Sequence, residues 1–145
     1  MKDVVYPLQK AYKSLLSGIT YNSVAVPVYY QYIPDDIEPA NYIIFGSITD
    51  NDQSTLSSQD SLISIQVKIH TWADKYNDGK AVASIASQVL IKVYPLNGPT
   101  IDLSADGLQL RSTKKTNDFT ENWTVNNQRV YIDRTIQFSH NIFYK

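Results

Sequence analysis

The chain has 145 residues, a formal net charge of −1 and no cysteine, and its apolar fraction of 43% is that of an ordinary globular protein. A length of 145 residues predicts one domain, residues 1–145. The missing cysteines exclude disulfides, thiolate nucleophiles and cysteine-based metal sites, and the balanced charge disfavours a sequence-reading DNA-binding protein. We expect no signal peptide and no membrane span, because no run of about 18 apolar residues occurs.

The first third of the chain predicts a helix, an extended arm and a short strand. Residues 7–16 place apolar side chains on one helical face. Residues 24–33 alternate like a strand, and Pro27 within them favours an edge or a projecting hairpin. After an acidic, proline-rich turn at residues 34–39, residues 42–49 predict a short apolar strand with a bulge or close contact at Gly46. Residues 50–60 are polar except for Leu56 and predict a long exposed loop.

The clearest pattern lies between residues 62 and 94, where a strand and a helix follow one another. In residues 62–72 the apolar side chains fall on every second position, which predicts a strand with one buried face. A polar turn at residues 74–79 then leads into a helix whose apolar residues recur at three- and four-residue steps. We therefore expect this helix to pack on the sheet, with the following residues buried between them: Ile63, Ile65, Val67, Ile69, Val82, Ile85, Ala86, Val89 and Leu90.

The last third predicts two further strands. One strand runs over about residues 108–115, residues 116–127 form a polar connection around Trp123, and residues 128–144 return as a long final strand. Arg134 and His140 interrupt the apolar face of this last strand. The resulting order αβββαββ predicts an α+β domain, with a mainly antiparallel sheet, two helices packed on it and a projecting hairpin or arm.

Few residue patterns indicate catalysis or cofactor binding. His70 and His140 belong to no spaced metal motif, and only a chance meeting across adjacent strands would make them a metal site. The acidic cluster Asp35, Asp36 and Glu38 lies on one turn, where neighbouring carboxylates are poorly placed to flank a substrate bond. Nucleotide-binding and hydrolase motifs are absent from the sequence. We therefore expect no cofactor, no bound metal and no enzymatic activity.

A family resemblance carries the functional expectation. The order of elements, the strand 42–47, the strand 67–72 and the helix start at residues 78–83 together resemble the tail terminator, or tail-completion (head-to-tail joining), proteins of tailed bacteriophages. The resemblance implies a ring-forming structural protein of the virion, made in the host bacterial cytoplasm and placed at the head–tail junction or the tail end. It implies a homo-oligomeric ring, a hexamer first and a dodecamer as the alternative, that contacts other neck and tail proteins.

This hypothesis assigns roles to particular residues. DNA would pass through the lumen of the ring without sequence-specific binding, so we expect acidic residues there, with Asp50, Asp52 and Asp60 as candidates. The segments 24–36 and 50–60 would make subunit contacts. The candidate interface residues are Val28, Tyr29, Tyr30, Tyr32, Asp35, Asp36, Lys114 and Lys115.

Two other functions remain open at this stage. The first is a monomeric ligand-binding or adaptor domain that uses exposed tyrosines, since eleven Tyr accompany only four Phe. The second is a small hydrolase built on His70 or His140 with the acidic cluster. Oligomeric state separates the ring from the monomeric adaptor.

Overall fold

A computed structural model of the chain describes residues 3–34, 41–55, 58–74, 79–97, 101–125 and 129–144. The predicted turn at residues 34–39 and the turn at residues 74–79 lie largely outside these ranges. The elements in chain order are α1 (Val5–Leu16), β1 (Thr20–Tyr21), β2 (Val24–Ala25), β3 (Val28–Tyr30), β4 (Asn41–Asp52), β5 (Asp60–Asp74), α2 (Lys80–Val93), the short 3-10 helix η1 (Ser104–Asp106), β6 (Leu108–Val125) and β7 (Arg129–Tyr144).

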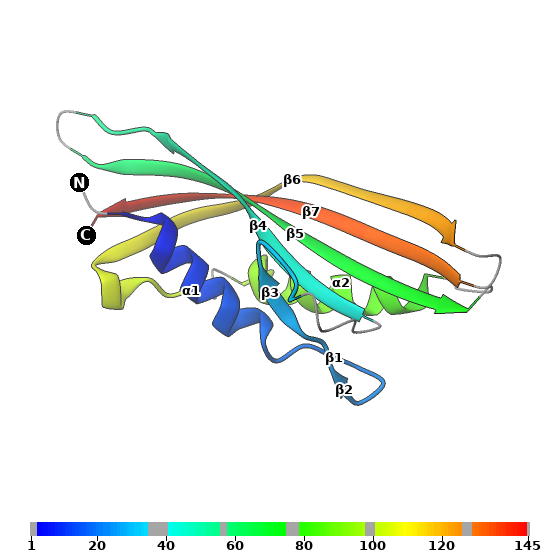
Figure 1. Cartoon of the computed structure of the whole chain (residues 1–145). Helices are drawn as coiled ribbons and strands as arrows, with labels where there is room; N and C mark the ends of the chain where they lie inside the picture. The colour runs from blue at the N-terminus through cyan, green and yellow to red at the C-terminus, as the bar shows by residue number, and fades with distance from the viewer. Residues whose placement is uncertain are drawn as a thin grey trace.

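Five strands form one twisted sheet in the order β3-β4-β5-β7-β6, and both helices lie on the same face of it (Figure 1). Every neighbouring pair is antiparallel except β3 and β4, which are parallel. The sheet is long and narrow, and none of the helices in the described residues lies on its other face (Figure 1). The predicted α+β class with a mainly antiparallel sheet is confirmed.

The core lies between β5, β7 and the two helices. Ile65 and Ile69 on β5 and Ile85 on α2 are fully buried, as the two periodicities predict, because the strand and the helix each turn one apolar face toward the other. Helix α1 adds a second apolar stripe. Its fully buried side chains are Leu8, Tyr12 and Leu16.

Helix α1 begins at Val5, two residues before the predicted start. The Asp3 carboxylate accepts hydrogen bonds from the backbone N–H groups of Val5, at 3.0 Å, and Tyr6, at 3.3 Å. These donors belong to the first turn and have no partner within the helix, so Asp3 acts as a cap that the apolar pattern did not reveal.

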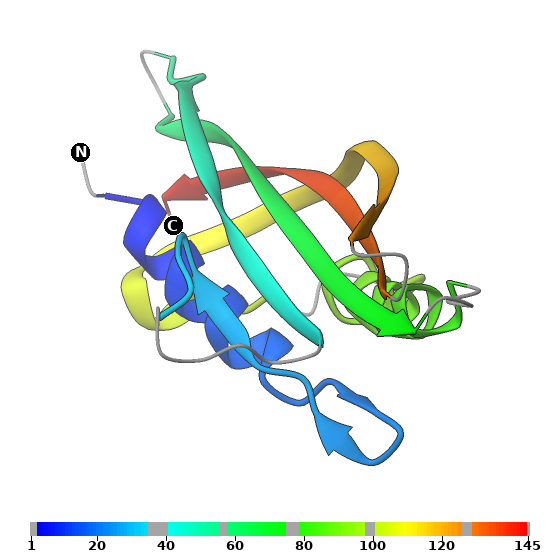
Figure 2. The ribbon, with the colours of Figure 1, turned by 45° about the vertical axis from the view of Figure 1, so that its right-hand side comes forward.

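The predicted arm at residues 24–33 is divided into two short strands. Residues Asn22 and Ser23, with φ angles of 51° and 64°, make a tight turn that joins β1 to β2. Such left-handed turns suit two-residue hairpins. The β1–β2 hairpin projects beyond α1, and β3 then lies along one edge of the large sheet (Figure 2). The expected projecting hairpin and the edge strand therefore come from neighbouring parts of one segment.

The predicted loop at residues 50–60 is wrong at both ends. Strand β4 runs to Asp52, and Asp50 and Asp52 pair with Ile63 and Ser61 of β5 in a regular antiparallel ladder. A bulge between Gly46 and Thr49 precedes this pairing, as the glycine suggested, and bulges increase the local twist of a strand. The polar residues therefore extend a hairpin that reaches beyond the rest of the sheet (Figure 1).

The predicted polar connection at residues 116–127 is also wrong. Strand β6 continues to Val125, and its second half pairs with β7, as in the pair Asp118 and Ile136. Bulges after Leu110 and Lys115 interrupt the register of this pairing. Most side chains of β6 beyond Leu110 are exposed on both faces, and an edge strand of this kind lacks the apolar alternation by which strands are recognised.

Candidate functional site

The uncovered face of the sheet carries a polar and aromatic cluster. The register aligns Tyr42 of β4, His70 of β5 and Asp133 of β7 in one row across three strands. Residues directly opposite one another in a ladder share a face and touch, so these side chains meet although they are far apart in sequence. Neighbouring positions add Lys68 and Tyr131.

Asp133 is the centre of this cluster. Only 3% of its side chain is exposed, and its two carboxylate oxygens bind different partners: Oδ1 lies 2.5 Å from Nδ1 of His70, and Oδ2 lies 3.2 Å from Nζ of Lys68. A buried carboxylate requires such partners, because leaving it unpaired costs several kilocalories per mole. The cluster therefore fixes β5 against β7 on the uncovered face.

Two tyrosine rings enclose His70. The ring of Tyr42 stacks on it at 4.6 Å and 23°, and the ring of Tyr131 lies on its other side at 5.2 Å and 32°. Tyr29 of β3 extends the series with an edge contact to Tyr42 at 6.3 Å. Burial, with a smaller contribution from the Asp133 charge, raises the pKa of Tyr42. The sequence placed His70 on the polar face of its strand but gave no sign of the partners.

His140 lies on the opposite, helix-covered face and is fully buried. Its Nε2 shares a hydrogen bond with the Tyr12 hydroxyl of α1, and its Nδ1 lies 2.9 Å from Oγ1 of Thr113 on β6. Burial lowers the pKa of His140 from 6.5 to about 4, so the ring is neutral at neutral pH. The idea that His70 and His140 meet as a metal site is wrong, because the sheet separates them.

The described residues contain neither a cluster of metal-ligating side chains nor a membrane-spanning helix. Among those residues no group of three or more His, Cys, Asp or Glu side chains is placed to hold a metal ion. Within the same ranges no helix is both long and apolar enough to cross a bilayer.

The predicted interface residues fall into three groups. Tyr29 and Tyr30 are half-buried on β3, and Tyr32 just beyond them is 74% exposed. The prediction that Val28 lies at a subunit interface is corrected, because its side chain is only 6% exposed and packs in the core of its own chain. Asp35 and Asp36 lie outside the described residues. Lys114 and Lys115 are exposed on the edge strand β6.

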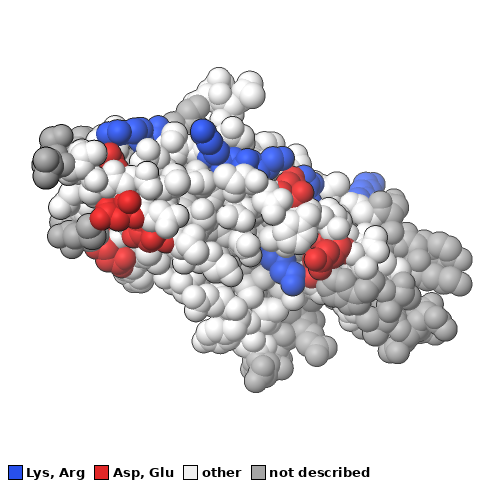
Figure 3. All heavy atoms as spheres, turned by 90° about the horizontal axis from the view of Figure 1, so that it is seen from above, with Lys and Arg blue, Asp and Glu red and all other residues white. Residues whose placement is uncertain are grey.

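The predicted lumen residues differ in their surroundings. Asp50 and Asp52 are exposed on the outer half of β4, whereas the Asp60 side chain is 12% exposed and lies 3.8 Å from Arg111 of β6. Hydrogen bonds from Ser54 lower the pKa of Asp52. Seen from the uncovered face, acidic side chains gather at the end of the β4–β5 hairpin, and basic side chains follow the opposite long side over β6 (Figure 3).

A second charged group lies farther along β6. Asp118 accepts two hydrogen bonds from Arg134 of β7, at 2.8 and 2.7 Å, and these bonds hold the pKa of Asp118 below its usual range. Lys115 also reaches Asp118 at 3.2 Å. Arg134 alone already balances the negative charge of Asp118 through its two hydrogen bonds. Lys115 therefore leaves this group with one positive charge in excess.

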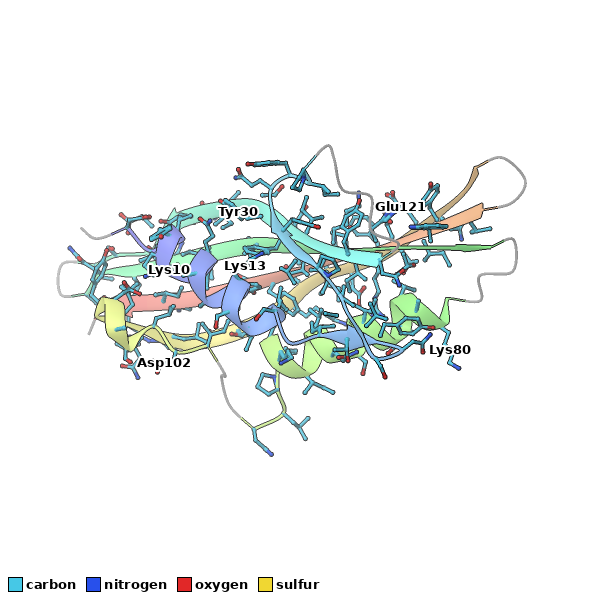
Figure 4. All side chains as sticks on the ribbon, turned by 60° about the horizontal axis from the view of Figure 1, so that its bottom comes forward. Lys10, Lys13, Tyr30, Lys80, Asp102 and Glu121 are labelled. Atoms are coloured by element: carbon cyan, nitrogen blue, oxygen red, sulfur yellow. The ribbon has the colours of Figure 1, made fainter. Side chains whose placement is uncertain are left out.

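A shallow groove of about 480 Å³ runs between α1 and the edge of the sheet. Lys10, Lys13 and Tyr30 line it, and all three are seen on this side of the molecule in Figure 4. The Lys13 ammonium donates a hydrogen bond to the Val28 carbonyl. The described residues that line this groove include no histidine and no carboxylate.

Comparison with known protein families finds no matching family model, and comparison with curated proteins finds no match. Comparison with solved structures does find matches. One of the matching structures is a chain from the virion of a native gene transfer agent particle, with a TM-score of 0.51 over 78% of this chain and 78% of that chain. Only 11% of the aligned residues are identical. At this identity the match establishes a shared fold.

Proposed function

We propose that the chain is a structural protein of a tailed phage or phage-like virion, and that it forms a homo-oligomeric ring at the head–tail junction or the tail end. The observation that carries the proposal is the fold, which the chain shares over 78% of its length with a chain of a gene transfer agent virion. The order of elements, which resembles the tail terminator proteins, points the same way. We propose a hexamer, which contacts other neck and tail proteins.

The geometry of the polar groups supports an architectural role. His70 and Asp133 form the pair that most resembles a catalytic dyad, but the histidine is enclosed between Tyr42 and Tyr131, and its side chain is only 13% exposed. A general base must reach the proton that it removes. In this arrangement the imidazole holds two strands together.

The lumen would be lined by the end of the β4–β5 hairpin. Asp50 and Asp52 are exposed there and would repel the phosphates of passing DNA, so that the duplex is confined but not gripped. Asp60 is less suited to this role, because Arg111 offsets its charge and little of its side chain reaches solvent. Genomic DNA would therefore pass without sequence-specific binding.

Electron microscopy tests this function directly. The purified chain should give rings at high concentration, with a mass in light scattering that is a multiple of 16.4 kDa. An antibody against the chain, labelled with gold, should mark the neck or tail end of purified particles. A chain that stays monomeric, and an antibody that marks no particle, would contradict the proposal and favour a monomeric adaptor with exposed tyrosines such as Tyr32, 74% exposed, and Tyr6, 57% exposed.

A further inference from the structure

The two long edges of the sheet are free at the same end of the molecule. Strand β3 pairs with β4 from Val28 and Ile43 to Tyr30 and Phe45, and beyond the last pair no described strand pairs with the outer edge of residues 47–52. Strand β6 is the opposite edge of the sheet, and no described strand pairs with its outer side. Free strand edges present unpaired N–H and C=O groups that can pair with another chain.

These two edges lie level with each other across the sheet. One row of paired residues runs from Asn51 on β4 to Ser112 on β6, and the next runs from Asp50 to Thr113. The strands β4, β5, β7 and β6 alternate in direction, because each pair is antiparallel. A second copy placed beside the first would therefore bring its β6 antiparallel to the free edge of β4. The helix-covered faces of the two sheets would then lie on the same side.

The charges of the two edges are complementary. Asp50 and Asp52 stand on the β4 edge, and Arg111, Lys114 and Lys115 stand on the β6 edge. Asp50 is exposed, has no ion-pair partner in the described part of the chain and lies in the row of Thr113, on the helix-covered face. On the same face of β6, two positions beyond Thr113, Lys115 adds a cation to a carboxylate already bound by Arg134, whereas Lys114 lies on the uncovered face. Opposite charges on paired strands stabilise the pairing, and long side chains also reach diagonal neighbours.

We propose that a second copy of this chain docks edge to edge, with residues 47–52 of β4 in one copy pairing antiparallel to residues 111–117 of β6 in the next. Because the two edges differ, the contact is heterologous, and such contacts close into a ring when the rotation between copies allows it. The inference rests on the proposed ring and specifies its interface. It moves Asp50 from the proposed lumen to the junction between subunits, so that of the two exposed aspartates only Asp52, nearer the hairpin end, stays a lumen residue.

Cysteine cross-linking tests the contact, since the chain has no cysteine of its own. The double variant N51C/S112C carries one thiol on each edge, both exposed on the uncovered face and at the two ends of one row. With a flexible bis-maleimide, concentrated protein should give a ladder of dimers, trimers and larger species. Each single variant should stop at dimers. In the matched control S87C/S112C, one thiol lies instead on the outer side of α2, and no ladder should form.

A charge reversal gives an independent readout. Asp50→Lys places a cation against the basic edge of the next copy, and we expect association in light scattering to weaken about tenfold, because an attraction is replaced by a repulsion of similar size. Glu121→Lys makes the same change in charge farther along β6 (Figure 4) and should leave association unchanged.

The outcomes separate this inference from the proposed function. A ladder that is specific to N51C/S112C supports edge pairing. Rings in the microscope without that ladder would overturn edge pairing while the ring itself stands. A chain that is monomeric at every concentration and gives no ladder would overturn both.

Discussion

The two faces of the central sheet each hold one histidine, and the two residues are stabilised in opposite ways. On the helix-covered face, His140 is neutral and bound by the hydroxyl groups of Tyr12 and Thr113. On the uncovered face, His70 binds the carboxylate of Asp133 and lies between tyrosine rings. The comparison shows that a buried polar group can be stabilised by different partners, hydroxyl groups at His140 and a carboxylate at His70. Neither histidine needs a catalytic role to explain its position.

The largest expected effect lies in the covered face. Ile65 is fully buried in the middle of β5, so Ile65→Ala should lower the free energy of unfolding by about 2–5 kcal/mol, measured by urea denaturation. The matched change on the uncovered face is Ile44→Ala, where the side chain is only half-buried, and the loss should be smaller. Equal losses at the two sites would mean that the two faces do not differ in packing.

The covered face should also be sensitive to acid. The pKa of His140 is lowered from 6.5 to about 4, so the unfolded chain binds a proton there before the folded chain does. The stability contributed by the neutral ring is therefore present above about pH 6.5 and is lost as the pH falls toward 4, by about 3 kcal/mol in total.

Urea denaturation at several pH values between 4 and 7 measures this loss. His140→Gln removes the titrating ring, so the variant should be less stable at pH 7 but should lose less stability on acidification than the parent chain. A parent and a variant with parallel pH profiles would contradict the assignment.

The uncovered face should respond less strongly. Asp133→Ala leaves His70 and Lys68 without their shared carboxylate, and we expect a loss of about 2 kcal/mol, since hydrogen bonds to charged groups contribute about 1.5–3 kcal/mol. Lys68→Met is the control. Lys68 is 47% exposed, so its removal should cost less than about 1 kcal/mol by the same denaturation measurement.

The sequence predicted the fold best where one face of an element is apolar. Strand β5 and helix α2 have clear periods, and both were found as predicted. The second half of β6 and the outer end of β4 were predicted as loops, because their polar residues have no apolar face and are held in the sheet by pairing with distant strands. Pairing of this kind depends on sequence-distant partners and leaves no local signal.

The partners of the two histidines were hidden for the same reason. Asp133 is 63 residues from His70, and Tyr12 is 128 residues from His140. The alternation along each strand correctly assigned His70 to the polar face and placed His140 within the apolar face. The register that joins each histidine to its partners is a property of the whole sheet and follows from no single segment.

The smallest expected effect concerns DNA. On the uncovered face, Lys68 is paired with Asp133, and Arg111 lies near Asp60 and over the ring of Phe143, so these two cations are offset within the chain. Lys114 has no ion pair in the described residues and would lie at the proposed contact between subunits. Each phosphate contact by a free cation would add affinity that falls with salt. We therefore expect no tight binding to duplex DNA in a filter-binding measurement at physiological salt. A dissociation constant below about 1 µM with a steep salt dependence would approach the affinity of specific DNA-binding proteins. That result would contradict passive passage of DNA and indicate a protein that binds the duplex tightly.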